Sequence, residues 1–285
     1  MEMLSDNRKV AVVYLSWLPY GIEHLQEFVR SYLMNPAGYP HKLVFLFNGL
    51  DHSQDVSHFR DCVSSALSDF EILELNDGMD IDAYFFAAKE IDADYILFLN
   101  TYSRFQSGEW LRKYMIAMSE DTGVISATAS CQSLYSTVFH DNKWSWESHK
   151  SFSENFRKFK LLLKATCYWR FLIAPFPNPH VRTNAFLVRR NDFLQLKRKT
   201  LNRKFDAYLF ESGKQSLTRQ LAAKGLKALV VGRDGTTYNM SRFEESRTFW
   251  TGEQENLLVS DNQTEMYKNA DSSYRSHLNE IAWHL

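Results

Sequence analysis

The stretch Asp94-Tyr95-Ile96-Leu97-Phe98-Leu99-Asn100-Thr101-Tyr102-Ser103-Arg104 predicts the strand on which the rest of the fold is built. Residues 95–99 form an apolar, β-prone run, and such continuous apolarity is typical of a strand covered on both faces of a parallel sheet. Ligands of open α/β sheets bind just beyond the carboxyl ends of the strands, so Asn100, Thr101 and Ser103 lie where a site is expected. An ordinary polar loop after a strand explains the same residues equally well.

Strand and helix patterns alternate along the chain on both sides of this run. The alternation predicts βαβ units, and therefore an α/β fold with a mostly parallel sheet flanked by helices. The predicted strands span residues 10–15, 42–47, 70–75, 95–99 and 123–127, and the predicted helices span 22–34, 55–68, 82–91 and 108–119.

The second half of the chain is less regular. Residues 132–153 show no clear period and predict a long loop, which in compact domains is often functional. Further patterns predict a strand at 183–189, a helix at 191–196, a helix at 213–224 that ends at Gly225, and a strand at 227–231. The polar tail, 233–285, is expected to wrap around the domain and to end in a helix near 273–283.

Composition and motif content exclude several classes of protein. The formal net charge of −1 argues against a nucleic-acid partner. Cys62, Cys131 and Cys167 show no metal spacing and favour a reducing compartment. The first residues are polar, unlike a secretory signal, and no apolar run reaches the roughly 18 residues of a membrane span. A cytoplasmic protein is therefore expected.

No motif of the common nucleotide or metal enzymes occurs in the sequence. GxSxG, P-loop and GxGxxG patterns are absent, which disfavours hydrolases, nucleoside triphosphatases and Rossmann oxidoreductases. The nine histidines form no HxxxH or HExxH spacing, and on that ground no zinc site is expected.

Five segments together indicate a family. Residues 95–100 are followed by Gly108-Glu109-Trp110-Leu111, by Gly123-Val124-Ile125, by 183–193 and by 211–225. Their order and spacing resemble GT-A glycosyltransferases, most closely the inverting family-2 type, over roughly residues 9–235. The resemblance implies a mixed, mostly parallel sheet and a nucleotide-sugar donor. It also implies a catalytic domain over 1–235, with a nucleotide-binding half at about 9–130 and an acceptor half at about 131–235, followed by a wrapping extension at 236–285.

One departure from the family concerns its metal. Relatives carry an Asp-x-Asp pair that holds the donor diphosphate through a divalent ion, whereas this chain has Asn100-Thr101-Tyr102-Ser103. Amides and hydroxyls are poor substitutes for carboxylates around Mg²⁺ or Mn²⁺. Metal-independent transfer, a metal held by other groups and loss of activity all stay open. Transfer without a metal needs side-chain cations at the diphosphate, and the candidates are Arg104, His180, Arg182 and Arg219.

Glu211 is the candidate catalytic base. Inverting transfer needs a carboxylate that takes the proton of the acceptor hydroxyl, and Glu211 matches the first acidic position of the family's base motif. Ser212 stands at the second position, where the family has aspartate. A carboxylate at a helix N-terminus, stabilised by the macrodipole, is the competing interpretation. Asp206 is the alternative base.

Candidate donor-binding residues follow the predicted strands. By resemblance, the loops after the first two strands hold the base and ribose, where Trp17 would stack and Asp51 would accept a hydrogen bond. A turn or cap role explains Asp51 as well. The prolines of 176–184 stiffen a loop that would aim polar groups at a phosphate or a sugar, or merely connect two elements. The full predicted donor set is Ser16, Trp17, Asn48, Asp51, Asn100, Thr101, Ser103, His180, Arg182, Asn184 and Arg219; of Asp80 and Asp82, one is a weaker candidate, and capping explains Asp82.

Residues 154–171 are both basic and aromatic. A surface helix that contacts anionic lipid is one interpretation, and it suits a lipid-linked or lipopolysaccharide acceptor at the inner face of a membrane. A core helix with solvated lysines is the other.

The sequence thus predicts a glycosyltransferase that moves a sugar from a nucleotide-sugar donor to a carbohydrate acceptor, in surface-polysaccharide assembly. A non-catalytic, GT-A-like module that binds nucleotide or sugar is the alternative, motivated by the missing acidic pair. A nucleotidyltransferase on a similar sheet is disfavoured, because no glycine- and lysine-rich signature follows the first strand.

Overall fold

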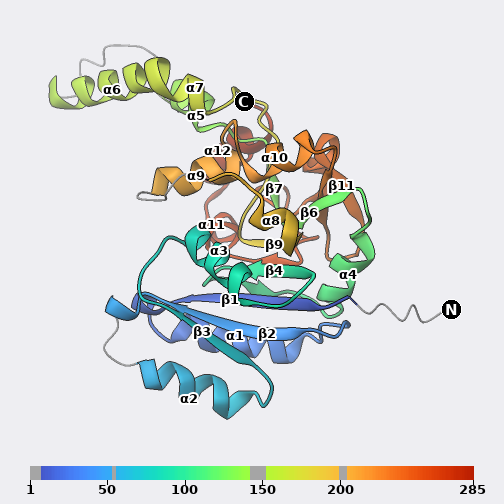
Figure 1. Cartoon of the computed structure of the whole chain (residues 1–285). Helices are drawn as coiled ribbons and strands as arrows, with labels where there is room; N and C mark the ends of the chain where they lie inside the picture. Colours follow the sequence, from blue (N-terminus) through green and yellow to red (C-terminus); the bar gives the residue numbers. More distant parts are fainter. Residues whose placement is uncertain (1–7, 53–55, 142–151, 199–203) are drawn as a thin grey trace.

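The computed structural model describes residues 8–52, 56–141, 152–198 and 204–285. An eight-stranded sheet forms its centre, in the order β11-β10-β6-β9-β4-β1-β2-β3 (Figure 1). The bounds of these strands are β1 Val10–Trp17, β2 Lys42–Asn48, β3 Glu71–Leu75, β4 Tyr95–Leu99, β6 Thr122–Ser126, β9 Ala185–Arg189, β10 Lys227–Val231 and β11 Thr237–Asn239.

The sheet is mixed and mostly parallel, which confirms the predicted fold class. Strands β3, β2, β1 and β4 pair in parallel, and so do β6 and β10. Strand β9 lies between β4 and β6 and runs antiparallel to both, with Ala185 opposite Leu99. Because β9 runs backwards, its first residue lies beside the last residue of β4, and the residues before β9 lie beside the turn that follows β4.

Helices cover both faces of the sheet because its strands are apolar on both sides. On β1, Val12 and Tyr14 face one core, which contains α1, α2 and α4. Ala11 and Val13 face the other core, which contains α3, α8, α10 and α12. The helix bounds are α1 Glu23–Met34, α2 Val56–Ala66, α3 Asp80–Glu90, α4 Trp110–Ala117, α8 Arg190–Leu194, α9 Lys204–Ser212, α10 Leu217–Ala223, α11 Asn262–Asn269 and α12 Ser272–Trp283.

The predicted loop at 132–153 is wrong in its first part, where α5 spans Leu134–Asp141. Its buried face, which includes Val138, packs in a small core with Leu162 and Trp169, so a tertiary contact stabilises a helix that the sequence pattern hides. The partner segment consists of α6 Phe152–Lys164, the π-helical turn Ala165–Trp169 and α7 Arg170–Leu172. Residues 142–151 of the predicted loop, residue 55 of the predicted second helix and residues 1–7 lie outside the described residues.

The predicted helix at 213–224 begins four residues late. Ser216 caps α10 by accepting a hydrogen bond from Arg219 N at 3.3 Å, and Gly225, with φ of 79°, follows the helix as predicted. Gly213 instead bridges to Ile173 after the end of α9. Glu211 therefore lies in the last turn of α9 and not at a helix N-terminus, so the macrodipole does not stabilise its charge.

The tail contributes to both the sheet and the core. Strand β11 pairs with β10, and β12 (Val259–Ser260) pairs with β5 (Arg104–Phe105) directly after the β4 turn. Strands β7 (Ala129–Ser130) and β8 (His180–Val181) form a second small pair. Trp283 packs in the α3 core, and its Nε1 donates to the carbonyl of Phe249 at 2.9 Å. Within the described ranges, no helix combines the length and apolarity needed to cross a bilayer.

We predict that replacing Trp283 destabilises the whole domain. Trp283→Ala removes a side chain that is 8% exposed and joins the tail to the main core, so the free energy of unfolding should fall by about 3 to 5 kcal/mol. Urea unfolding followed by circular dichroism measures the change. Tyr274→Ala, on the same helix but 45% exposed, is the control and should stay within about 0.5 kcal/mol of wild type. Equal stability of Trp283→Ala and wild type would show that the tail is not part of the cooperative core.

Candidate functional site

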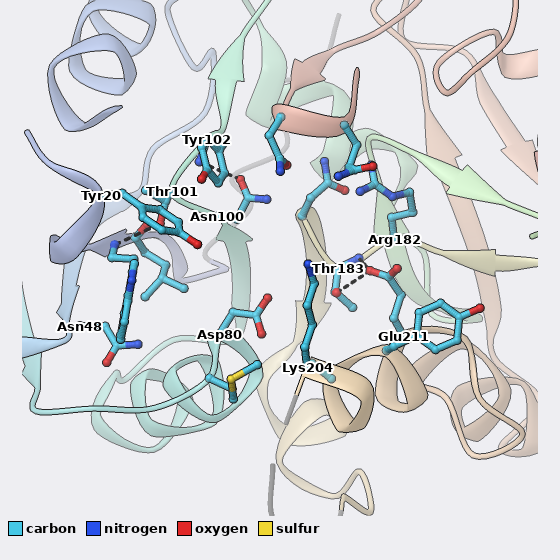
Figure 2. A pocket seen from close by; sticks show the side chains of 18 of the residues that line it. Tyr20, Asn48, Asp80, Asn100, Thr101, Tyr102, Arg182, Thr183, Lys204 and Glu211 are labelled. Carbon is cyan, nitrogen blue, oxygen red and sulfur yellow. Dashed lines mark hydrogen bonds between the residues drawn. The ribbon is translucent and has the colours of Figure 1, made fainter. Parts of the chain in front are cut away.

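A pocket of about 920 Å³ lies at the carboxyl ends of β1, β2 and β4 (Figure 2). The start of α3, the residues before β9, one face of α9 and two segments of the tail form its other walls. Eight residues of the predicted site line it: Trp17, Asn48, Asn100, Thr101, His180, Arg182, Asn184 and Glu211. The edge of the sheet at which the sequence placed a ligand is therefore hollow.

Three predicted donor residues, Ser16, Ser103 and Asp51, do not line the pocket. Ser16 is buried within β1, opposite Phe47 of β2. Ser103 is buried and donates to Asn100 Oδ1 at 2.9 Å, so it supports the turn rather than facing the cavity. Asp51 is exposed in the short 3₁₀ turn Leu50–His52.

Three further predicted residues, Asp206, Arg219 and Arg104, do not line this pocket. Asp206 lies on another side of α9 from Glu211 and lines a separate pocket of about 240 Å³. Arg219 donates from Nη2 to Asn178 Oδ1 at 3.0 Å and thereby holds the proline-rich loop. Arg104, a candidate cation, forms an ion pair with Glu27 and donates to the Tyr102 carbonyl at 2.8 Å, so it stabilises the turn from outside the cavity.

The turn after β4 does not fit a divalent cation. Thr101 Oγ1 donates to the Leu15 carbonyl and accepts from Trp17 N, both at 3.0 Å. Asn100 Oδ1 accepts from Tyr102 N at 3.1 Å and from Ser103 Oγ. The Thr101 oxygen thus connects the turn to β1, and the Asn100 oxygen forms hydrogen bonds within the turn. Neither is a carboxylate oxygen, the ligand that Mg²⁺ and Mn²⁺ prefer. Among the described residues, no group of three metal-ligating side chains that could share an ion lies in this pocket.

Glu211 presents its carboxylate to the cavity. Lys204, Tyr208 and Glu211 recur at helical spacing on α9 and line the pocket from one face of that helix. Thr183 donates to Glu211 Oε2 from both its backbone N and its Oγ1, each at 2.7 Å (Figure 2). This pair of bonds fixes the carboxylate, and no hydrogen bond to its other oxygen, Oε1, comes from any described residue. The carboxylate can therefore accept a proton from a bound hydroxyl.

Asp80 is a second pocket carboxylate, and only a weaker candidate in the sequence. Burial raises its pKa above the ordinary value of 3.8, the hydrogen bond from Ile81 N lowers it, and the nearby charge of Glu211 raises it again. Lys204 lies between the two carboxylates (Figure 2) and lowers the pKa of Asp80. Two carboxyl groups, one on α3 and one on α9, thus share the cavity with the lysine of α9.

Arg182 is the best-anchored cation of the pocket. Its Nη1 donates to Asp261 Oδ2 at 3.1 Å, and its guanidinium lies 4.2 Å from the centre of the Phe249 ring. Asp261 is fully buried and also caps α11, accepting from Gln263 N and Thr264 N. Two residues of the tail therefore fix the Arg182 guanidinium in place. The side chain does not have to change conformation to bind an anion in the cavity.

His180 is buried at the pocket wall. Its Nδ1 lies 2.7 Å from the Asn178 carbonyl oxygen. Because a carbonyl oxygen can only accept a hydrogen bond, Nδ1 carries a proton and donates it. Burial lowers the pKa of its imidazole, an effect that Glu211 opposes and that Arg182 and Arg219 reinforce. A neutral ring results, with Nε2 as an acceptor, so His180 differs from the diphosphate cation that the sequence predicted.

Two buried amides lack one partner each. Asn48 donates from Nδ2 to the Gly78 carbonyl at 2.8 Å, but its Oδ1 has no partner among the described residues. Asn184 accepts at Oδ1 from Thr128 at 2.9 Å, and within the same ranges its Nδ2 is unpaired. Because an unpaired buried polar atom costs free energy, one free acceptor and one free donor in a single pocket indicate a polar ligand.

Much of the pocket wall was not predicted. Tyr20 and Tyr102 follow β1 and β4, and their aromatic character was the only available signal. The tail residues could not be found from the sequence, because their distance along the chain from the strand ends gives no sign of contact. They are Phe249, Trp250, Asn262 and Gln263. Gly49 has a clear role: with φ of 86°, it lies against Trp17, whose Cζ3 would be 2.9 Å from an added Cβ.

Comparisons with known proteins give structural neighbours only. No family model and no curated protein matches the sequence. A mannosyltransferase from Pyrobaculum calidifontis, in complex with GDP-Man and Mn²⁺, is 11% identical with a TM-score of 0.43, over 78% of this chain and 54% of that chain. The bifunctional glycosyltransferase WbbM, in its apo structure, is 10% identical with a TM-score of 0.43, over 99% of this chain and 45% of that one.

A third neighbour is the CMP:2-keto-3-deoxy-manno-octonic acid synthetase in complex with CTP, 13% identical with a TM-score of 0.40, over 78% of this chain and 90% of that one. The chain spans about half the length of the mannosyltransferase and of WbbM. Likeness at these scores assigns no activity to this chain.

We predict that Asp80→Asn stabilises the protein at neutral pH. The folded state holds the Asp80 proton more tightly than the unfolded state does, so wild-type stability falls as the pH rises from about 3.8 through the raised pKa. The Asp80→Asn variant has no ionisable group at this position, so its stability does not fall with pH for this reason. Its advantage in urea unfolding should be present at pH 7 and shrink towards pH 4. Asp69→Asn, at an exposed position, is the control. A variant less stable than wild type at pH 7 would contradict the assignment.

Proposed function

We propose that this protein is a glycosyltransferase of GT-A type, which transfers a sugar from a nucleotide-sugar donor to a carbohydrate acceptor with inversion. The observation that carries the proposal is the Glu211 carboxylate, fixed by Thr183 in a pocket at the strand ends that also contains the anchored Arg182. The order of sequence segments that resembles this family supports the same activity. In this proposal residues 9–130 form the donor side, 131–235 the acceptor side, and 236–285 a supporting extension.

The proposed reaction uses one proton acceptor and side-chain cations. The acceptor hydroxyl gives its proton to Glu211 as its oxygen bonds to the anomeric carbon, while the bond from that carbon to the diphosphate oxygen breaks. The nucleoside diphosphate leaves with additional negative charge, which Arg182 and Lys204 stabilise. No step requires a metal at the turn after β4, whose oxygens do not fit one.

The donor would extend from the ends of β1 and β2 towards Arg182. Trp17 offers a ring against which a base can stack, and the unpaired Asn48 Oδ1 can accept from a base or ribose donor group. Asn184 Nδ2, unpaired within the described residues, can donate to a phosphate or sugar oxygen. Asn100 and Thr101 would line the donor between these two ends.

We predict that Glu211→Gln abolishes turnover and keeps donor binding. The amide preserves the shape of the side chain but cannot take a proton, so turnover should fall by about 10² to 10⁴-fold. Calorimetry with UDP- and GDP-sugars, with and without Mn²⁺, identifies the donor, and release of nucleoside diphosphate over an acceptor panel gives the rate. Asp206→Asn is the matched variant on the same helix, and it should stay close to the wild-type rate because Asp206 lies outside the pocket.

Two results would overturn this assignment. Wild-type turnover in Glu211→Gln would remove Glu211 as the base, and loss confined to Asp206→Asn would favour the alternative carboxylate. Donor binding without product from the wild-type protein, over a broad acceptor panel, would favour the non-catalytic binding module.

We further propose that the protein contacts an anionic membrane surface through α6 and the turns after it. Leu162, Ala165 and Trp169 face the small core with α5, while the opposite side carries exposed apolar and basic side chains. In Figure 1, α6 extends away from the central sheet. Exposed aromatics beside lysine and arginine suit the interface of anionic lipid, where a lipid-linked acceptor would be presented. The exposed set is Phe156, Arg157, Phe159, Lys160, Leu163, Lys164, Tyr168, Arg170 and Phe171.

We predict that Phe156→Ser with Phe159→Ser lowers vesicle binding by about tenfold, because two aromatic anchors are lost, corresponding to about 1.4 kcal/mol. Co-sedimentation with vesicles that contain phosphatidylserine measures the binding, and pure phosphatidylcholine vesicles test the charge requirement. Ile116→Ser, at an exposed apolar residue of α4, is the control. Equal binding of the double variant and wild type would exclude this surface.

A further inference from the structure

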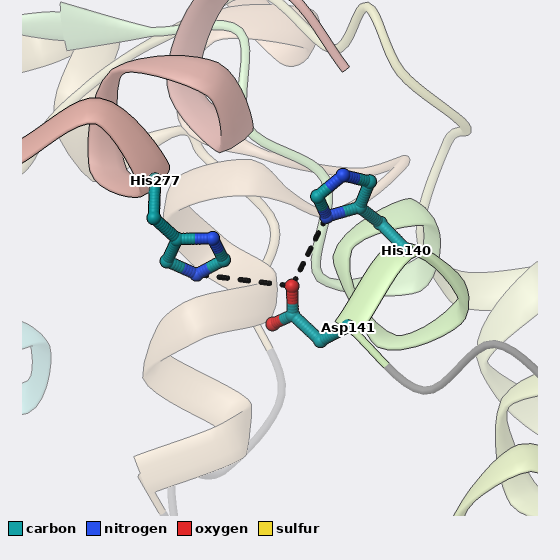
Figure 3. Close-up of side chains that lie close together, drawn as sticks. All are labelled: His140, Asp141 and His277. Atoms are coloured by element: carbon teal, nitrogen blue, oxygen red, sulfur yellow. Dashed lines mark hydrogen bonds and ion pairs between the residues drawn. The ribbon is translucent and has the colours of Figure 1, made fainter. Parts of the chain in front are cut away.

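Two histidines and an aspartate meet between α5 and α12, outside the candidate pocket (Figure 3). His140 and Asp141 are the last residues of α5, and His277 lies on α12 near the end of the chain. No spacing motif connects them, so the search for HxxxH or HExxH patterns could not find this cluster. Only the packing of the tail against α5 brings the three side chains together.

The distances suit a shared metal ion. Asp141 Oδ1 lies 3.1 Å from His140 Nδ1 and 3.7 Å from His277 Nε2 (Figure 3). One ligand atom from each of the three residues lies within 4.8 Å of the others. Ligands about 2.1 Å from a tetrahedral Zn²⁺ lie about 3.4 Å from one another, so small side-chain rotations would complete the geometry.

Glu280 supplies an independent reason to regard this cluster as a site. Its Oε1 lies 3.3 Å from His140 Nε2, the ring nitrogen that does not face Asp141. A proton on Nε2 that is donated to Glu280 leaves the Nδ1 lone pair directed at the space between the three ligands. Histidines that bind metals are commonly oriented in this way by a carboxylate on the opposite nitrogen. Glu280 lies one turn after His277 on α12, so a single helix supplies a ligand and the group that orients another.

The cluster is also accessible. The side chains of His140, Asp141 and His277 are 27%, 38% and 36% exposed, so an ion can enter from solution and keep a water molecule as its fourth ligand. Two imidazoles and one carboxylate suit Zn²⁺, Co²⁺ or Ni²⁺ better than Mg²⁺ or Ca²⁺, which prefer oxygen ligands.

We propose that His140, Asp141 and His277 bind a transition-metal ion such as Zn²⁺, with Glu280 as the positioning residue for His140. The ion would fasten the end of α5 to the C-terminal helix. Since α5 packs with α6 in the small core around Val138 and Leu162, the metal would stabilise the base of the exposed α6. Binding to the folded state alone raises its stability by mass action. The inference is independent of the proposed transferase activity.

The test uses the full chain after treatment with a chelator and dialysis. Titration with Co²⁺, followed by visible absorption, should give one equivalent bound, with the intensity of a tetrahedral site, and Zn²⁺ should displace it and raise the melting temperature. His277→Ala and Asp141→Asn should each weaken binding by about 100-fold, and Glu280→Gln by about tenfold. His284→Ala is the matched control: this histidine is near the same helix end but pairs with Glu244 at 3.0 Å, and it should bind Co²⁺ like wild type.

The outcomes separate the proposal from its competitors. No saturable Co²⁺ binding in wild type would reduce the cluster to an ion pair. Unchanged affinity in both His277→Ala and Asp141→Asn would place the ion elsewhere, and absorption from thiolate-to-cobalt charge transfer would point to the cysteines. Circular dichroism checks that the variants fold. If a variant that lacks a ligand does not fold, Glu280→Gln still tests the proposal, because it removes no ligand.

Discussion

The reversed strand β9 in the middle of the sheet is the constraint on which the site depends. Its hydrogen bonds to β4 place Ala185 opposite Leu99, so the chain that enters β9 passes directly over the turn that leaves β4. Asn100 N donates to the Asn184 carbonyl at 3.0 Å, which continues the strand pairing into the two loops. A parallel strand at this place would have its amino end at the far edge of the sheet, and neither Arg182 nor the Thr183 bonds to Glu211 would reach the pocket.

The positive charge of Arg182 is positioned by a buried residue of the tail, Asp261, rather than by another residue that lines the pocket. Arg182 is held by the fully buried Asp261, so removing either partner would leave an uncompensated buried charge at a cost of about 3 to 5 kcal/mol. Asp261 also caps α11, which ties the position of the arginine to the folding of the tail. The tail thus determines where positive charge meets a ligand, although it begins far from the strand ends along the chain.

The part of the fold that could be predicted is the part specified by local pattern. Strands β1, β2 and β4 are continuous apolar runs, and the helices between them show regular apolar spacing, so the parallel half of the sheet follows from the sequence. Helix α5 and the late start of α10 could not be predicted, because a small distant core stabilises the first and a serine cap with Gly213 determines the second.

The same distinction explains the candidate site. Residues at or directly after the ends of strands, such as Trp17, Asn48 and Asn100, were placed by the rule for strand ends, and all three line the pocket. The sequence could not decide whether Asp206 or Glu211 faces the pocket, because the rotation of α9 about its axis was unknown. Arg219 was predicted to bind the diphosphate because of its charge, but its side chain donates to Asn178 instead. Phe249, Trp250 and the His140 cluster depend on how the tail packs, which no local pattern reveals.

A crystal structure of the protein soaked with UDP or GDP would show whether a nucleotide binds at the carboxyl ends of the strands. We expect a diphosphate beside Arg182 and Asn184, a base near Trp17 and Asn48, and Glu211 Oε1 facing the open space beyond the diphosphate. A nucleotide bound at another surface, or a pocket that stays empty at millimolar concentrations of both nucleotides, would contradict this expectation.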